Sequence, residues 1–426
     1  MYTISSTHRV LAAALVCTSV ACSDVPGATE PGALRGTTTL ASQSEGRGAF
    51  QRYVAIGTSV SMGTASDGTI AASQLQAWPA QLARMAHRDI TQPLISGTGC
   101  RSPLQAPLAT GVRISGEAAA TDPSQLSCSP LEDGITLPTQ DLAINAATAR
   151  DALTTTRENV TDPANARLYQ NVLPPGATQV SAMEAQNPKF VSVEFGANEV
   201  LNARSGIAIP GVTLFPVNAF EAYYTQVVDR AAAATKYGLL VGLIHDVGAF
   251  PGFRRGAELY ADRGAFFVAF NVNVSADCDG SDNLLFVPVR VPVAVATGLA
   301  MRRAGAGPYT LSCAGGPATA QDYVLTPSEV ATVNGMMAQM NDFIRSEAER
   351  VGFAYTELDE LYGMPGIKPT FSVVQLMTSQ QPYGQYVSLD GLHPSGDGQR
   401  VIAEAAARAI DDRYQFGIMS ALVASR

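Results

Sequence analysis

Residues 53–59 read YVAIGTS, a short and mostly apolar run that closes with a glycine and two hydroxyl side chains. A run of this length before a turn signal is typical of a strand buried in a parallel sheet. The pattern returns further along the chain, at 190–196, 239–244 and 353–358. Helical spacing of apolar residues follows at 217–237, 328–350 and 396–411. This alternation predicts an α/β fold with a parallel sheet and helices on both of its faces.

The segments between these elements are less regular. Residues 74–88 have the period of a helix, 90–95 predict a second strand, and 139–156 read as a further helix. Two stretches, about 100–135 and 250–325, are interrupted by Gly and Pro and carry two cysteines each. We interpret both as irregular surface insertions into the domain.

Composition limits the classes of protein to consider. The chain has 426 residues, of which 46% are hydrophobic and 15% charged, so it can bury a sizeable core. Its formal net charge of −9 argues against nucleic acid as a partner, because such partners need clustered Lys and Arg. Beyond the first 22 residues no apolar run is long enough to span a bilayer.

The N-terminus has the features of an export signal. His8 and Arg9 precede an apolar stretch over 10–21 that is too short for a membrane span, which predicts a signal peptide over 1–21. The following Cys22 completes a stretch, SVAC, that resembles the lipobox of bacterial lipoproteins, although it has serine where leucine is usual. A lipidated Cys22 would hold the protein at a membrane surface of the bacterial envelope. The alternative is ordinary cleavage near Ala21, which would leave a periplasmic or secreted protein.

The rest of the chain divides into a linker and one domain. Residues 22–48 are rich in small and polar side chains and predict a flexible tether, which places the domain at 49–426.

Four cysteines remain when the signal and Cys22 are set aside, and in an exported chain an even number suggests disulfides. Four cysteines allow three pairings, and the shortest loops favour Cys100–Cys128 and Cys278–Cys313. Each bond would staple one insertion. We expect no metal site, because the chain has no CxxC pair and no neighbouring histidines.

The first of three polar clusters follows the opening strand and reads GTSVS over 57–61. At a strand-to-helix turn, Ser59 can point its hydroxyl into a cleft while its own N–H faces a developing oxyanion. The structural alternative is that Ser59 caps the next helix. Ser61 is the rival nucleophile, although its place in the first helical turn favours capping or packing.

The second cluster is GANE over 196–199, directly after a predicted strand. The amide of Asn198 can donate to an oxyanion, although Asn after Gly is also common in plain turns.

The third cluster is SLDGLHP over 388–394. Asp390, three residues before His393, can accept from the imidazole Nδ1–H and leave Nε2 free to deprotonate a serine. Of the four histidines, only His393 has an acidic partner at a spacing suited to such a base. A solvated loop histidine is the alternative.

In order and spacing, the three clusters resemble the GDSL or SGNH hydrolase family, whose blocks read GDS, GxND and DxxH over a flavodoxin-like sheet. The resemblance spans 53 to about 411. It implies a three-layer α/β/α SGNH hydrolase fold. It also implies Ser59 as nucleophile and as an oxyanion donor through its N–H, His393 as general base, Asp390 as its orienter and Asn198 as a further oxyanion donor. No metal or organic cofactor is implied.

The remaining family block supplies a backbone N–H to the oxyanion. Residues 142–149 resemble it with Ala146 in place of its glycine, and Gly97 within 96–99 is the competing candidate. Two further departures are Thr58 for the family's Asp and Glu199 for the Asp after Asn, and we expect neither to abolish activity.

The resemblance implies a serine esterase or lipase that hydrolyses small-molecule or lipid esters through an acyl-enzyme. The mostly apolar stretch 200–216 favours acyl or lipid-like esters. A carbohydrate O-acetylesterase is the alternative within enzymes. A catalytically silent lipoprotein that binds a partner or glycan is the alternative outside them.

Overall fold

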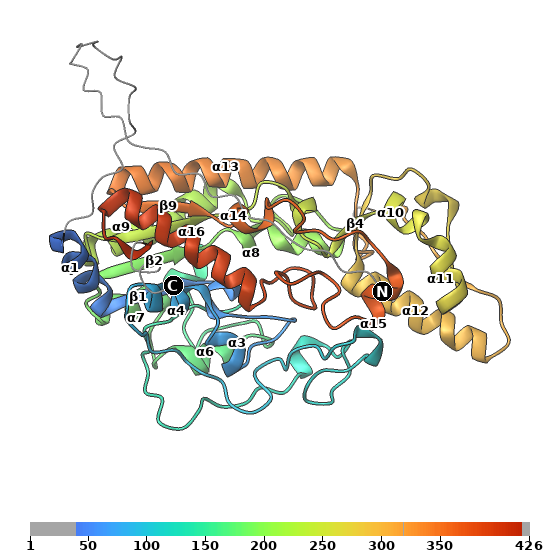
Figure 1. The fold of residues 1–426 in the computed structure, drawn as a ribbon, viewed down its shortest axis with the longest axis horizontal. Coiled ribbons are helices and arrows are strands. Elements are labelled where there is room, and N and C mark those ends of the chain that lie inside the picture. The colour runs from blue at the N-terminus through green and yellow to red at the C-terminus, as the bar shows by residue number, and fades with distance from the viewer. Residues whose placement is uncertain (1–39, 318, 420–426) are drawn as a thin grey trace, which may run out of the picture. The chain divides into compact units, whose positions relative to one another are not determined.

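The computed structural model describes residues 40–317 and 319–419, and its centre is a parallel sheet (Figure 1). The strands are β1 (Tyr53–Gly57), β2 (Phe190–Glu194), β3 (Gly238–Gly242) and β9 (Ala354–Glu357), paired in that order. The first three are buried at every position. β1 and β3 accordingly read as continuous apolar runs, whereas β2 also contains the buried polar residues Ser192 and Glu194.

A short extended segment, 140–144, completes the sheet beside β1. The N–H of Leu142 donates to the carbonyl of Ala55 at 2.9 Å, and the N–H of Ala55 donates to the carbonyl of Gln140 at 2.9 Å. The spatial order of the sheet, read by position in the chain, is therefore 2-1-3-4-5, which is the flavodoxin-like order. The predicted fold class is confirmed.

Two local predictions were wrong around this segment. Residues 90–95 form no strand and make only an isolated bridge from Ile95 to Leu131, because Pro93 lacks the N–H that a ladder needs. Residues 139–156 form one short helix, α5 (Ala149–Thr154), in place of a long one. The chain turns at Ala146, whose φ of 63° lies in the left-handed region.

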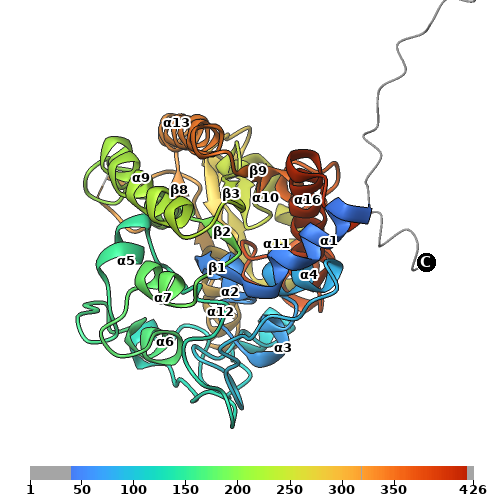
Figure 2. The same cartoon turned by 90° about the vertical axis from the view of Figure 1, so that its left-hand side faces the viewer.

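Helices cover both faces of the sheet (Figure 2). One layer holds α7 (Gln179–Ala185), α9 (Val217–Ala234) and α13 (Pro327–Val351), and the other holds α4 (Trp78–Met85) and α16 (Gly396–Tyr414). The start of α13 follows directly from its sequence. The Thr326 hydroxyl and the Glu329 side chain cap each other's backbone N–H groups, and Pro327 occupies the first helical position, where no N–H is needed.

Helix α1 (Leu40–Ala49) differs from the predicted tether over its residues 40–48. It leads directly into the core residue Phe50, and Gly46 lies so close to Phe416 that an added Cβ would be 2.7 Å from the Cβ of that side chain. The predicted signal peptide and Cys22 lie outside the described residues.

The 250–325 insertion is folded rather than irregular. It contributes α10 (Gly256–Ala261), α11 (Arg263–Phe270), α12 (Val287–Arg303) and two small sheets. The first sheet joins β4 (Phe253–Arg255), β6 (Leu284–Phe286) and β8 (Val324–Leu325), and the second joins β5 (Val272–Val274) and β7 (Tyr309–Leu311). The irregular interpretation was wrong because a proline such as Pro288 lies in the first turn of α12, where it is tolerated.

The remaining elements connect these layers. The short α-helices are α2 (Ser59–Met62), α3 (Ala71–Gln74), α6 (Ala166–Val172), α8 (Ala197–Leu201), α14 (Asp359–Tyr362) and α15 (Val373–Thr378). Single 3₁₀ turns are Phe50–Arg52, Leu108–Thr110, Pro123–Gln125, Asn202–Ser205, Val247–Ala249 and Ala276–Cys278. Among the described residues, no helix combines the length and apolar character that a bilayer crossing requires.

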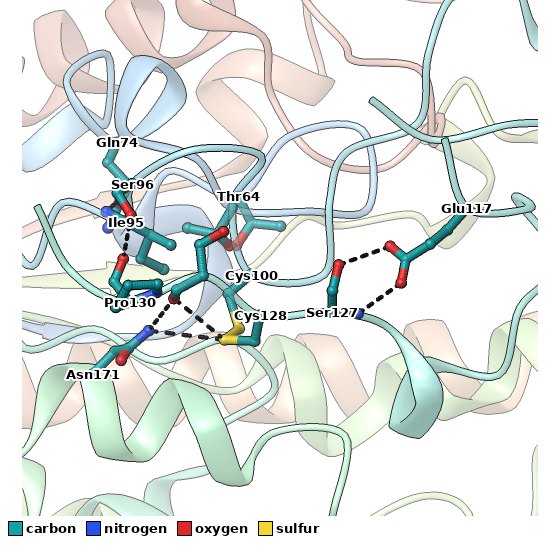
Figure 3. Close-up of a disulfide and its surroundings, with 12 residues drawn as sticks. Thr64, Gln74, Ile95, Ser96, Cys100, Glu117, Ser127, Cys128, Pro130 and Asn171 are labelled. Carbon is teal, nitrogen blue, oxygen red and sulfur yellow. Dashed lines mark hydrogen bonds between the residues drawn. A yellow bond between two sulfur atoms is a disulfide. The ribbon is translucent and has the colours of Figure 1, made fainter. Parts of the chain in front are cut away.

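Both expected disulfides are present, Cys100–Cys128 and Cys278–Cys313, one in each insertion. Near the first disulfide (Figure 3), the Asn171 amide of helix α6 donates to the carbonyl of Ser129 at 3.1 Å. The second joins the turn after β5 to the chain after β7.

Phe190 lies at the start of β2, fully buried and stacked on Phe50 with ring centroids 4.7 Å apart. We expect Phe190→Ala to lower the free energy of unfolding by about 3–5 kcal/mol, because a buried ring leaves a cavity. Phe267→Ala is the matched control, since that ring is 53% exposed and its loss should cost within about 0.5 kcal/mol. Urea denaturation measures both, and similar losses for the two variants would contradict this description of the core.

Candidate active site

Ser59 begins helix α2 directly after strand β1. Thr58 is the extended residue between them, with φ of −111° and ψ of −159°, so the chain reverses sharply at this point. The turn is tight enough that a Cβ added at Gly57 would lie 2.7 Å from the Ser61 hydroxyl. This close approach explains why the strand has to end in glycine.

A buried carboxylate holds this turn from the neighbouring strand. Glu194, the last residue of β2, accepts hydrogen bonds from the backbone N–H of Thr58 at 3.0 Å and from its hydroxyl at 2.9 Å. The Ser61 hydroxyl donates to the same carboxylate at 2.9 Å. Burial raises the pKa of Glu194, while these donors act in the opposite direction.

The two candidate nucleophiles therefore have different surroundings. The Ser61 hydroxyl donates to Glu194 and accepts from the indole N–H of Trp78 at 3.1 Å, so it is enclosed behind the turn. Ser59 lies on the open side, where its Oγ is 2.9 Å from Nε2 of His393. The geometry favours Ser59 for chemistry and gives Ser61 a structural part.

His393 reaches Ser59 from the loop that precedes α16. Its Nδ1 lies 2.7 Å from Oδ2 of Asp390, on the side of the ring opposite to Ser59. The structure therefore brings all three predicted side chains into one line, although 334 residues separate Ser59 from His393. Asp390 and His393 are both buried.

Asp390 is ionised in this setting. Burial acts to raise its pKa, but the charge of His393 and hydrogen bonds from the His393 ring and the N–H groups of Leu392 and His393 outweigh it, lowering the pKa to about 2. The N–H of Asp67 also donates to it at 2.6 Å. Since a carboxylate only accepts, Nδ1 carries the hydrogen whether the ring is charged or neutral. In the neutral state Nε2 is the acceptor that faces the Ser59 hydroxyl.

A second histidine, His245, also lies beside carboxylates, which the sequence analysis did not predict. Nε2 of His245 lies 2.7 Å from Glu357, and its Nδ1 lies 3.6 Å from Asp359. Glu357 follows His245 by more than a hundred residues along the chain, so no local spacing could reveal the pair. His245 is 57% exposed, and both ring nitrogens face carboxylates rather than a hydroxyl.

Asn198 and Ala146 adjoin Ser59 in one pocket. That pocket is lined by Ser59, Ala146, Asn198 and His393, and Gly97 is not part of its lining. Among the described residues, neither the Ser59 N–H nor the Ala146 N–H has an acceptor within the protein. Two free backbone donors and the Asn198 amide beside one hydroxyl are the groups that an oxyanion requires. Ala146, rather than Gly97, therefore lines the same pocket as Ser59.

Asn198 and Glu199 both hold the segment that carries Ala146. The Asn198 amide donates to the carbonyl of Ala147 at 2.8 Å, and Oε1 of Glu199 accepts the N–H of Ala149 at 2.8 Å. Burial raises the pKa of Glu199 to about 7, with that backbone hydrogen bond acting against it. The sequence suggested little importance for Glu199, but its buried carboxyl fixes the start of α5.

Two pockets of opposite character meet at Ser59 and His393. The apolar pocket is narrow, about 50 Å³, and is lined by side chains such as Leu243, Phe250 and Met337. The polar pocket is about 590 Å³ and includes arginine, aspartate and asparagine side chains. A molecule with an apolar part and a polar part can therefore place the bond between them at Ser59.

The only grouping of potential metal ligands within the described residues is Asp277 with Cys278 and Cys313. Both cysteines are consumed by their disulfide, so the group does not fit a metal ion.

The chain has a flavodoxin-like α/β fold, and Ser59 and His393 meet at the carboxyl edge of its parallel sheet. The model of the GDSL-like lipase/acylhydrolase family matches residues 53–406, and the chain belongs to this family of ester hydrolases.

Three solved structures overlap the chain over most of its length. An acetylxylan esterase from Geobacillus stearothermophilus does so at 13% identity with a TM-score of 0.34, covering 85% of this chain and 94% of its own. An α/β hydrolase enzyme from the metagenome of Lake Arreo, Spain, gives 13% and 0.35, with 84% and 94% covered. An extracellular lipase from Streptomyces rimosus gives 12% and 0.32, with 86% and 97% covered. Comparison with curated proteins gives no match.

The raised pKa of Glu199 predicts a pH-dependent stability. The folded protein keeps this proton up to about pH 7, whereas the unfolded chain releases it near the ordinary value of 4.5. The unfolded state thus binds fewer protons in this window, so the free energy of unfolding falls as pH rises through it. Glu199→Gln imitates the neutral side chain and removes this contribution.

Relative to Glu199→Gln, we expect the wild type to lose about 1–3 kcal/mol of stability between pH 4.5 and 7. Denaturant titrations of both proteins at several pH values measure this difference. Other titrating groups, including buried Asp141, are common to both proteins and cancel. Parallel stability curves would show that Glu199 does not titrate there.

Proposed function

We propose that the protein hydrolyses carboxylic esters by a two-step acyl transfer at Ser59. The observation that supports this best is the line of contacts from Ser59 Oγ to His393 Nε2, at 2.9 Å, and from His393 Nδ1 to Asp390, at 2.7 Å. A nucleophile, a base and a group that orients the base are the parts that this chemistry needs.

In the first step His393 removes the Ser59 proton as Oγ attacks the ester carbonyl carbon. Ionised Asp390 stabilises the charged imidazole of His393, and this imidazole then gives the proton to the departing alcohol. In the second step His393 activates a water molecule, which releases the acid and restores the serine. Asp390 stays ionised throughout, as its low pKa favours.

The oxyanion of each tetrahedral intermediate is held by the N–H groups of Ser59 and Ala146 and by the Asn198 amide. The Asn198 amide has two hydrogens, and one of them already donates to the carbonyl of Ala147. That bond orients the second hydrogen and keeps the three donors together. Loss of one such donor typically costs about 3 kcal/mol in the transition state.

The apolar pocket favours acyl or lipid-like esters as substrates. Its lining buries an acyl chain, and its volume of about 50 Å³ suits a short chain better than a long one. A carbohydrate O-acetylesterase is the second candidate, because the larger polar pocket can take a polar alcohol and an acetyl group needs little apolar space.

The proposal also includes export of the protein from the cytoplasm. The two disulfides are consistent with an exported protein. A signal peptide over 1–21 and a lipid anchor at Cys22, which would bring the enzyme to a membrane surface of the envelope, remain predictions from the sequence.

We expect Ser59→Ala to remove hydrolysis of short p-nitrophenyl esters, by at least about 10⁴-fold in kcat, because no nucleophile remains. Initial rates of the purified protein measure this, with circular dichroism to verify folding. Labelling by a fluorophosphonate should also be lost.

Ser61→Ala is the matched control, since it removes a neighbouring hydroxyl that faces Glu194 instead of His393. This variant should still be labelled at Ser59. Turnover by folded Ser59→Ala would exclude Ser59 as nucleophile, and a folded wild type that is never labelled would support a silent binding protein instead.

The two substrate classes predict a different dependence of kcat/KM on the length of the acyl chain. If the apolar pocket binds the acyl chain, kcat/KM should peak at a short chain, and Met337→Ala should move the peak to longer chains. A series of p-nitrophenyl esters of increasing acyl length measures this. Acetylated sugars cleaved faster than any acyl ester, with no effect of Met337→Ala, would favour the carbohydrate O-acetylesterase.

A further inference from the structure

Three arginines line the polar pocket together with Ser59 and His393: Arg101, Arg150 and Arg204. The Arg150 guanidinium lies over the Phe215 ring, 5.6 Å from its centroid, so within the described residues Arg101 and Arg204 are the two without a partner. Throughout 40–317 and 319–419, neither guanidinium donates a hydrogen bond or lies within ion-pair distance of a carboxylate. A guanidinium has five donors in a rigid fork, and such groups are normally paired when they leave bulk water.

The carboxylates of the same pocket have ion-pair or hydrogen-bond partners elsewhere in the chain. Asp67 pairs with Arg113 at 2.6 Å, and Asp162 accepts from the amide of Asn165 at 2.6 Å. Asp151 accepts from the hydroxyls of Thr148 and Thr155, which flank α5 on either side. Each of these acids therefore has a partner within the chain other than Arg101 or Arg204.

The backbone of Arg101 is held in an unusual conformation by its neighbours. It follows Cys100 of the first disulfide, and its φ of 47° lies in the left-handed region that a side chain disfavours. Its N–H donates to the carbonyl of Ser127, whose own N–H and hydroxyl both donate to Glu117 (Figure 3). Strained backbone held by a crosslink and hydrogen bonds is a feature of functional positions.

The surroundings of Arg101 are unfavourable for a lone cation. Burial lowers its pKa, and the like charges of Arg204 and Arg113 add to that effect, while Asp67 and Asp162 oppose it. Its Nε is fully buried without a partner among the described residues. An anion bound in the pocket would supply the missing acceptor for both guanidinium groups.

We propose that the polar pocket binds an anionic group, phosphate or carboxylate, on the alcohol part of the ester, and that Arg101 and Arg204 recognise it. This inference rests on the proposed esterase function and names the substrate class of that site. Arg204 lines both pockets, so it lies where the acyl and alcohol parts of a bound ester meet. The first disulfide insertion then serves to carry Arg101 to the pocket.

The test compares three esters with one acyl group: monobutyrylglycerol, butyrylglycerol phosphate and the butyryl ester of glyceric acid. In the wild type we expect kcat/KM for an anionic ester to exceed that for monobutyrylglycerol by about tenfold or more. Arg101→Gln and Arg204→Gln should each lower this ratio by roughly tenfold, and the double variant should bring it close to one. The ester that gains most identifies the anion as phosphate or carboxylate.

Arg303→Gln is the matched control, an exposed arginine outside both pockets, and it should keep the wild-type ratio. Arg204→Glu gives an independent variant should Arg101→Gln fail to fold, and it should invert the preference towards the neutral ester. Equal kcat/KM for all three esters in the wild type, or an unchanged ratio in the double variant, would overturn the inference. Turnover of monobutyrylglycerol by Ser59→Ala would instead overturn the proposed function.

Discussion

The site depends on one buried carboxylate at the end of the second strand. Glu194 accepts hydrogen bonds from the N–H and hydroxyl of Thr58 and from the hydroxyl of Ser61, and these bonds fix the turn that positions Ser59. A carboxyl group without such donors would be costly in this interior. The turn and the carboxylate therefore stabilise each other, and the pairing of β1 with β2 sets their distance. Thr58, which departs from the family's Asp, donates to Glu194 in this network.

The second constraint is the ionised state of Asp390. It lies in the interior, yet its hydrogen bonds and His393 favour the charged form over the effect of burial. The same residue receives the N–H of Asp67, from the loop that follows α2. Asp390 is thus bonded both to His393 and to the loop after Ser59, and these bonds hold the imidazole beside Ser59.

Much of the architecture could be predicted because its signals are local. The strands at 53–57 and 238–242 are continuous apolar runs, and 190–194 is mostly apolar. The cap of α13 can be predicted from Thr326 and Glu329, which lie three residues apart. The three polar clusters follow strand ends or precede a helix, and this placement predicted Ser59 and His393. Each of these features could be predicted because it is encoded by residues that lie close together in the sequence.

The features that were missed depend on distant partners. Segment 140–144 is a strand only because β1 presents an open edge to it, and its sequence also suits a helix. Glu194 looks like an ordinary polar residue in a strand until Thr58 and Ser61 are placed beside it. The acidic neighbours of His245 and the unpaired state of Arg101 likewise emerge only from the folded chain. Helix α12 of the 250–325 insertion was missed because it carries Pro288 in its first turn and Pro292 in its interior, and prolines usually indicate a break.

The contact between the Ser66–Asp67 loop and residues 388–390 has a consequence for how the site comes into being. Ser66 and Ser388 are joined at 2.7 Å, and Asp67 and Asp390 at 2.6 Å, across more than three hundred residues of intervening chain. A polypeptide emerging from the ribosome has its serine long before its imidazole. The contact between Ser59 and His393 therefore forms only after nearly the whole domain has been synthesised, when the segment that carries residues 388–393 closes onto the loop after α2.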